Sequence, residues 1–238
     1  MIRLLPLLLL LTACGGREDI RDYYYPVREL TGGLVYEYRN TGTVETAEYE
    51  YWYYLGINRD TALYLSATRY ADGVTPVQVS TERIRNEGAY LESLTLFPRL
   101  LTGARARTEA EVIYARTFPF HTGDGRASGY RVRFLDPDNS DAENYVSLNR
   151  YYRGDTVIDV LGETRKAVVF DLAGEVSQRD PQRGDISPTF TGYEIYARGL
   201  GLVEYLRDLG PGGRAGGKLV RRVPMDEFAG SGGTDPAE

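Results

Sequence analysis

The sequence predicts a mainly β protein: a single antiparallel sheet or half-barrel of about eleven strands, strongly curved, with at most one or two short helices. Three observations carry this prediction. Apolar and polar residues alternate with a period of two over most of the chain, the pattern of half-buried strands. The chain holds 20 tyrosines beside one tryptophan and seven phenylalanines, and tyrosine favours strands. Polar segments with glycine separate the alternating runs, as hairpins require.

The predicted strands follow one another along the chain with short turns between them. Their expected ranges are residues 34–39, 49–56, 62–69, 77–85, 89–97, 130–135, 145–152, 156–161, 165–172, 192–197 and 202–206. Asn86-Glu87-Gly88 is expected as a hairpin turn, and Pro98 should end the strand that follows it. Strands joined by such turns pair antiparallel, so we expect a meander.

Residues 99–117 fit two patterns. Alanines and glutamates within residues 104–115 suit a helix, whereas Val112-Ile113-Tyr114 is typical of a strand. We expect one short helix here, followed by a strand that ends near Phe118.

Aromatic side chains occupy both faces of the strand expected at residues 49–55. Because successive side chains in a strand point to opposite faces, Tyr51 and Tyr53 share one face and Trp52 and Tyr54 share the other. One face should fill the core, and the other requires a covering helix or a ligand. These four residues are therefore the candidate ligand-binding residues. The alternative is that the aromatics simply suit a pleated, half-buried surface.

The first fourteen residues have the organisation of a secretory leader. Arg3 supplies the basic start, residues 4–11 the apolar run, and Thr12-Ala13 the small residues before a cleavage point. The run is too short to span a bilayer, which takes about 20 residues. Cys14 is the only cysteine, so the chain cannot form an internal disulfide.

Leu11-Thr12-Ala13-Cys14 resembles the lipobox of bacterial lipoproteins. The resemblance implies that the Cys14 sulfur receives a diacylglycerol, that the leader is cut before it, and that the new amine is acylated, for instance with palmitate. Two or more acyl chains anchor a protein stably. The predicted partner of Cys14 is therefore a membrane.

The chain divides into four predicted segments. They are a signal peptide at residues 1–13, a lipidated tether at 14–22, a β domain at 23–208, and a glycine-rich C-terminal tail at 209–238 with an edge strand at 218–223. Gly15 is not the aspartate that holds some lipoproteins on the inner membrane, which favours the outer membrane. Arg17-Glu18-Asp19 weakly resembles a surface-export signal, but we favour the periplasmic face over the cell surface.

Two motifs resemble one group of proteins. Tyr24-Tyr25-Pro26-Val27 with residues 33–38 is similar to the opening of Bacteroidetes-type lipoproteins of unknown function, and residues 192–205 resemble their closing hairpin. Leu161-Gly162-Glu163-Thr164 sits where such proteins place a glycine turn. The resemblance implies a curved antiparallel sheet like that of the periplasmic lipoprotein carriers, in which a half-barrel partly encloses a helix or lipid. The match says nothing about activity.

The glycines of the closing motif have a physical explanation of their own. Gly199 and Gly201 lie two apart in a strand pattern, which indicates a tight turn or a close approach of two backbones.

The loop at residues 136–144 is the best metal candidate. Asp136, Asp138, Ser140 and Asp141 offer the oxygen ligands that Ca²⁺ prefers. The loop departs from the EF-hand pattern, because Asp141 replaces the glycine of the sixth position. We therefore expect a solvated hairpin loop and no metal.

The single histidine and two Arg-Gly-Asp tripeptides are weaker candidates for functional sites. His121 is the only histidine and falls in a polar loop, where we expect it to be exposed and not catalytic. Arg153-Gly154-Asp155 and Arg183-Gly184-Asp185 spell a tripeptide that integrins bind, but glycine between charges is ordinary turn chemistry.

The composition and the motifs limit the classes of function that the chain can have. The net charge of −6 argues against nucleic acid as a partner. No cofactor motif and no catalytic motif is found. We expect a lipid-anchored, non-enzymatic envelope protein that binds or assembles through its sheet, with an apolar ligand or lipid as the first candidate ligand. The alternatives are a surface-exposed glycan- or protein-binding lipoprotein and, third, a carboxylate-based hydrolase.

Overall fold

Strands dominate the structure. The computed structural model describes residues 18–44, 47–123 and 127–231, so the predicted leader and Cys14 lie outside the described residues. The strands are β1 (Leu34–Asn40), β2 (Tyr49–Arg59), β3 (Ala62–Tyr70), β4 (Pro76–Arg85), β5 (Gly88–Leu96), β6 (Thr108–Tyr114), β7 (Arg116–Pro119), β8 (Ser128–Asp136), β9 (Asn139–Val160), β10 (Glu163–Arg179), β11 (Thr189–Ala197), β12 (Gly201–Asp208) and β13 (Arg214–Pro224). The helices are η1 (Arg21–Tyr23), η2 (Leu30–Gly32), η3 (Gly210–Gly212) and α1 (Met225–Ser231). The prediction of a mainly β protein is confirmed.

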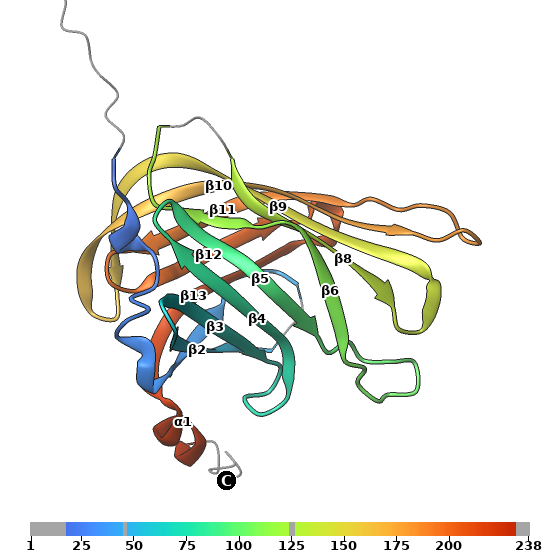
Figure 1. Ribbon diagram of the computed structural model, residues 1–238, viewed down its shortest axis with the longest axis horizontal. Helices are drawn as coiled ribbons and strands as arrows, with labels where there is room; N and C mark the ends of the chain where they lie inside the picture. The colour runs from blue at the N-terminus through green and yellow to red at the C-terminus, as the bar shows by residue number, and fades with distance from the viewer. Residues whose placement is uncertain (1–17, 45–46, 124–126, 232–238) are drawn as a thin grey trace, which may run out of the picture.

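The strands form one antiparallel sheet that closes into a barrel. Its order is β4-β3-β2-β1-β13-β12-β11-β10-β9-β8-β6-β5-β7, and a further pairing of β4, the first strand in this order, with β5, the last but one, closes the sheet. Most neighbours are consecutive in sequence, as a meander requires, and β1 pairs with β13 to bring the two ends of the chain together. Figure 1 shows β9 and β10 curving over the rest of the barrel.

The helix expected at residues 104–115 is wrong. Residues Thr108–Tyr114 form β6, in which Ala110 lies opposite Leu94 of β5. Ala110 and Val112 pack against a small apolar cluster around Leu94 and Val132. Packing of alternate apolar side chains on this cluster overrides the helix propensity of the alanines and glutamates.

Two predicted strands, residues 145–152 and 156–161, merge in the single strand β9, except that Leu161 lies in the turn that follows it. Opposite β10, Tyr152 pairs with Phe170 and Gly154 pairs with Val169, so Arg153 is the extra residue of a β-bulge. The turn expected at Arg153-Gly154-Asp155 is therefore wrong, because a continuous partner strand holds this segment extended. The second tripeptide, residues 183–185, does lie in the connection between β10 and β11, where Gly184 has a φ of +86°.

The C-terminal strand is interior to the sheet. Residues 218–223, expected as an edge strand, belong to β13, whose residues 214–218 pair with β12 and whose residues 217–224 pair with β1. Residues 219–223 therefore pair with β1 alone among the described strands, a long-range pairing that the local sequence could not reveal. Helix α1 follows β13. Within the described ranges, no helix has the length and apolar character needed to cross a membrane.

One end of the barrel, which we call the closed end, is covered by residues 20–32. We call this segment the plug. Ile20 and Leu30 are fully buried, and the Ile20 amide donates to the Phe120 carbonyl at 2.9 Å. Residues 18–22 therefore belong to the folded body and not to the tether in which they were expected. Ile20 is the reason, since burial of its side chain against the barrel stabilises the docked segment.

The opening and closing motifs meet at the closed end. The ring of Tyr25 packs so closely on Gly201 that a Cβ there would lie 2.4 Å from the ring, and Gly201 has a φ of +86°. The Tyr36 hydroxyl donates to the Leu200 carbonyl at 3.1 Å. Of the two alternatives predicted for Gly199 and Gly201, the tight turn is confirmed, since their φ angles are +74° and +86°; the close neighbour of Gly201 is a side chain and not a second backbone.

Candidate functional site

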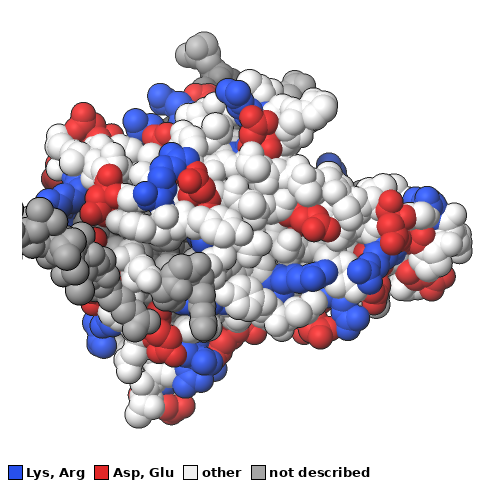
Figure 2. Space-filling model, turned by 90° about the horizontal axis from the view of Figure 1, so that it is seen from above, with Lys and Arg blue, Asp and Glu red and all other residues white. Residues whose placement is uncertain are grey.

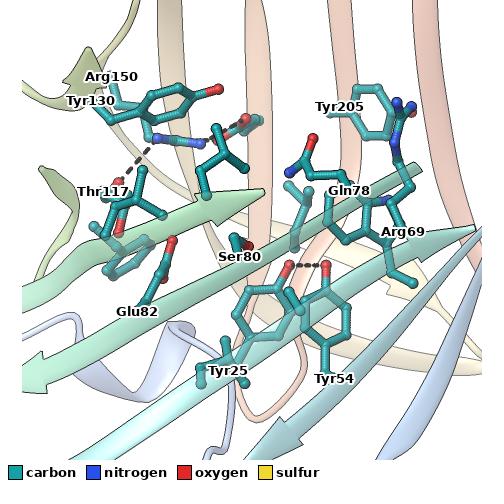
Figure 3. A pocket seen from close by; sticks show the side chains of 18 of the residues that line it. Tyr25, Tyr54, Arg69, Gln78, Ser80, Glu82, Thr117, Tyr130, Arg150 and Tyr205 are labelled. Carbon is teal, nitrogen blue, oxygen red and sulfur yellow. Dashed lines mark hydrogen bonds and ion pairs between the residues drawn. The ribbon is translucent and has the colours of Figure 1, made fainter. Parts of the chain in front are cut away.

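A cavity of about 340 Å³ lies inside the barrel. Its walls come from alternate, inward-facing residues of strands that are far apart in sequence, together with Tyr24 and Tyr25 of the plug. Figure 3 shows two groups of polar side chains: Arg150, Tyr130, Thr117 and Glu82 at one side, and Arg69, Gln78 and Tyr205 at the other.

A buried ion pair forms the first group. Arg150 of β9 donates from Nε to Glu194 Oε2 at 2.6 Å and from Nη2 to Oε1 at 3.2 Å, and its Nη1 donates to the Thr117 carbonyl at 3.1 Å. The Tyr196 hydroxyl also donates to Glu194, at 2.9 Å. Burial raises the pKa of Glu194, but Arg150 outweighs it and holds that pKa below the ordinary value. Glu194 is therefore an ionised, fully engaged carboxylate.

Glu82 of β4 has the opposite character. Its carboxylate accepts a hydrogen bond from the Tyr24 hydroxyl of the plug. Burial raises the pKa of Glu82 above its ordinary value, and the hydrogen bond and the charge of Arg150 offset only part of this. Glu82 is thus suited to hold a proton inside the cavity.

Two tyrosines form the floor between these groups. The hydroxyls of Tyr25 and Tyr54 lie 2.7 Å apart, and their rings lie 4.3 Å apart. Burial raises the pKa of both hydroxyls well above the ordinary value, so both stay protonated. They offer the cavity neutral hydrogen-bonding groups.

The second polar group lies where the cavity meets solvent, which we call the exposed end. Glu50 of β2 accepts hydrogen bonds from the Trp52 indole and, at 3.2 Å, from the Tyr205 hydroxyl. Arg69 of β3 contacts the same carboxylate at 3.7 Å. The side chains of Arg69 and Arg207 are 40% and 39% exposed, against 10% for Arg150, which locates the opening at this end.

Arg207 of β12 is the least engaged charge in the cavity. Its guanidinium lies over the ring of Tyr205, 5.2 Å from the centroid. The nearest carboxylate among the described residues is Glu194, at 4.0 Å, whose oxygens already accept from Arg150. No described residue accepts a hydrogen bond from the buried Nε of Arg207.

Apolar side chains from β5, β8 and β9 line the remaining wall, which we call the leucine wall. Its members are Leu91, Leu94, Leu96, Val132, Phe134 and Val146. The cavity therefore combines an apolar wall with polar groups at its two ends, as sites for amphipathic molecules do.

The structure divides the four candidate ligand-binding residues. Trp52 and Tyr54 line the cavity. Tyr51 lies on the opposite face, where Phe228 of α1 covers it with ring centroids 5.0 Å apart. Tyr53 is also on that face, and its hydroxyl lies against Gly33. The strand has the covering helix on one face and an open cavity on the other.

The metal candidate is a tight hairpin between β8 and β9. Asp136 accepts from the Asp138 amide at 2.9 Å and from the Gln178 side chain at 3.1 Å, and Asp138 accepts from the Leu101 amide. The Asp141 amide donates to the Asn139 side chain, and Ser140 lies beside it in β9. Among the described residues, no group of three or more metal-binding side chains comes together. His121 forms an isolated bridge with Asp19 and is half-buried.

Sequence reasoning missed the charged residues of the cavity. Arg150, Glu194 and Arg207 occupy inward positions of strands whose other cavity-lining residues are apolar or aromatic, whereas Glu82 shares the inward face of β4 with the polar Gln78 and Ser80. A charge in phase with the buried face of a strand is the signal that could have found them.

The face of the outer surface that is seen from above gives no comparable concentration of charge among the described residues. Figure 2 shows acidic and basic side chains interspersed over the face seen from above. Several pair across neighbouring strands, such as Arg133 with Glu111.

Comparisons with known proteins show the fold. No protein-family model and no curated protein matches the chain. A predicted lipoprotein of Parabacteroides distasonis of known structure is 13% identical, with a TM-score of 0.51, covering 84% of this chain and 98% of that one. A predicted exported protein of Bacteroides fragilis with a YmcC-like fold is also 13% identical, with a TM-score of 0.51, covering 81% of this chain and 95% of that one. At this identity the likeness is one of architecture over nearly the whole of both neighbours.

Proposed function

We propose that this chain is a lipid-anchored, non-enzymatic protein of the cell envelope whose barrel cavity binds an apolar or amphipathic ligand. The cavity of about 340 Å³ is the observation that carries the proposal. Ligand sites are concave, mostly apolar, and of about 300–1,000 Å³, with a few convergent polar groups. The leucine wall, the tyrosine floor and the polar groups fit this description.

The sequence and the fold neighbours support the location. The leader and the lipobox-like Leu11-Thr12-Ala13-Cys14 fit export and acylation, and the neighbours are described as a lipoprotein and an exported protein. We favour the periplasmic face of the outer membrane. Labelled palmitate should enter the wild-type protein and not Cys14→Ser, and the variant should leave the membrane fraction. Equal labelling of both would contradict the anchor.

Trp52 reports on the cavity directly, because it is the only tryptophan and lines the cavity wall. Bromine quenches indole fluorescence on contact. A dibrominated fatty acid added to the purified protein should therefore reduce the Trp52 emission in a saturable way, whereas the unbrominated fatty acid should compete for the same site.

A relocated tryptophan is the matched control. In the double variant Trp52→Phe, Tyr49→Trp, the indole moves to the other face of β2, since position 49 differs from 52 by an odd number of residues. Quenching should then be lost. Equal quenching of both proteins, or none in the wild type, would overturn binding in the cavity.

A surface-exposed glycan- or protein-binding lipoprotein would need an exposed aromatic patch. Among the described residues, the aromatics classed as exposed are Tyr114 of β6 and Tyr151 of β9, which lie on strands that do not pair with each other. The interior cavity is the better supported site.

A hydrolase is the second candidate, favoured by one observation. Glu82 and Glu194 line the same cavity, and their pKa values are shifted in opposite directions, as in acid and base pairs. Against it, both oxygens of Glu194 already accept hydrogen bonds from Arg150 and Tyr196, which a general base would have to give up. Hydrolysis of nitrophenyl glycosides or esters that is lost in Glu82→Gln would favour the enzyme over the binding protein.

A further inference from the structure

Arg207 is a cation without a committed partner. The cavity is lined by three arginines and three glutamates, and each glutamate already accepts hydrogen bonds from the protein. Arg150 donates two hydrogen bonds to Glu194. Arg207 reaches Glu194 only at 4.0 Å and donates no hydrogen bond to a described residue.

The position of Arg207 is nevertheless restrained by an aromatic ring. Its guanidinium stacks on the Tyr205 ring, and the Tyr205 hydroxyl is held by Glu50 at 3.2 Å. A stacked guanidinium is preorganised, so less side-chain entropy is lost when it binds a ligand. Its planar fork of donors matches the geometry of a carboxylate or phosphate.

We propose that Arg207 binds the anionic head group, a carboxylate or phosphate, of an amphipathic ligand whose apolar chain packs on the leucine wall. The inference rests on the proposed function, since it names the class of ligand for the same cavity. Arg207 lies at the exposed end, where a charged head can keep part of its hydration, and the leucine wall lines the same cavity. Arg69, also at this end, has a buried Nε without a partner and adds positive potential, although Glu50 offsets it at 3.7 Å.

Selectivity between an acid and its neutral ester tests the head-group assignment. The probes are dibromostearic acid and its methyl ester, which share the chain and differ in charge. Quenching of Trp52 by each gives its dissociation constant. In the wild type the acid should bind about tenfold more tightly than the ester, the ratio that 1.4 kcal/mol produces.

Arg207→Gln should remove this preference by weakening the acid about tenfold and leaving the ester unchanged. Arg222→Gln is the matched control. Arg222 also lies over a tyrosine ring, Tyr36, and has a buried Nε without a partner, but it does not line the cavity. This variant should keep the wild-type preference.

The outcomes separate the two proposals. An acid preference that survives in Arg207→Gln, or equal binding of acid and ester by the wild type, overturns the role of Arg207 and leaves the cavity as an apolar site. Absence of quenching by both probes overturns the proposed function itself. Dodecyl phosphate that displaces the bound acid more effectively than dodecanoate would identify phosphate as the preferred head group.

Discussion

The two ends of the barrel interior use the same types of side chain in different ways. Near the closed end, Arg150 and Glu194 are 10% and 1% exposed and hold each other through two hydrogen bonds. At the exposed end, Arg69 and Arg207 are about four times as exposed as Arg150, and neither donates a hydrogen bond to a carboxylate among the described residues.

The difference follows from desolvation. A charge removed from water must be paired and hydrogen-bonded, so the closed end can tolerate only charges whose hydrogen bonds are all made. At the exposed end, water can satisfy donors that the protein leaves open, and a ligand can replace that water. We infer that the charges at the closed end stabilise the fold and that those at the exposed end bind the ligand.

Removal of one partner from the closed side should have the largest effect. Glu194→Gln leaves Arg150 buried without its counter-charge, which should lower the free energy of unfolding by about 3–5 kcal/mol. Because the pKa of Glu194 is lowered in the folded protein, its stabilising contribution is present above the ordinary value of 4.5 and is lost as the pH falls through the folded value. Urea unfolding at neutral and acid pH measures both effects.

A surface pair provides the comparison for this variant. Arg133 donates to Glu111 from Nε at 3.0 Å, and the Glu111 side chain is 59% exposed. Glu111→Gln makes the same chemical change in solvent and should cost at most about 1 kcal/mol. Equal losses of unfolding free energy in the two variants would show that the buried pair at the closed end stabilises the protein no more than a surface pair does. The proposed difference between the two ends would then be wrong.

Much of the fold was predictable because its signals are local. The period of two identified most strands, and the turn at Leu161-Gly162 has a positive φ at both residues, as a two-residue hairpin needs. Closure of the sheet was not predictable, because it depends on the long-range pairing of β1 with β13, whose register no single segment encodes; the pairing of β4 with β5 is the hairpin that the turn at residues 86–88 predicted. The helix predicted at residues 104–115 failed for the same reason: its apolar partners lie on β5 and β8.

The candidate site was predictable only in part. Alternation placed Trp52 and Tyr54 on one face of their strand, and that face lines the cavity. The sequence could not reveal that Arg150 meets Glu194, 44 residues further along the chain, since the pair forms only when β9, β10 and β11 align. The role inferred for Arg207 was likewise not predictable, because it depends on the contact with the Tyr205 ring and on the position of the side chain in the cavity wall.

The smallest effect, and the one with the opposite sign, is expected at Glu82. Its pKa is raised in the folded protein, mainly by burial, so its contribution to stability is fully present below the ordinary value of 4.5 and is lost as the pH rises through the folded value. Glu82→Gln cannot ionise, and its side-chain carbonyl can still accept from Tyr24. The variant should therefore match the wild type near pH 4 and melt at a higher temperature than the wild type at neutral pH.

Melting temperatures of the wild type, Glu82→Gln and Glu194→Gln, measured across this pH range, compare the two carboxylates in one experiment. Relative to the wild type, Glu82→Gln should gain stability as the pH rises, and Glu194→Gln should lose it, because the two folded-state pKa values are shifted in opposite directions. Two carboxylates in one cavity would then respond oppositely to the same titration. A wild type that gains stability over Glu82→Gln with rising pH would mean that the cavity stabilises a further negative charge beside Glu194 and Glu50, and the head-group site at Arg207 would face a stronger repulsion than we infer.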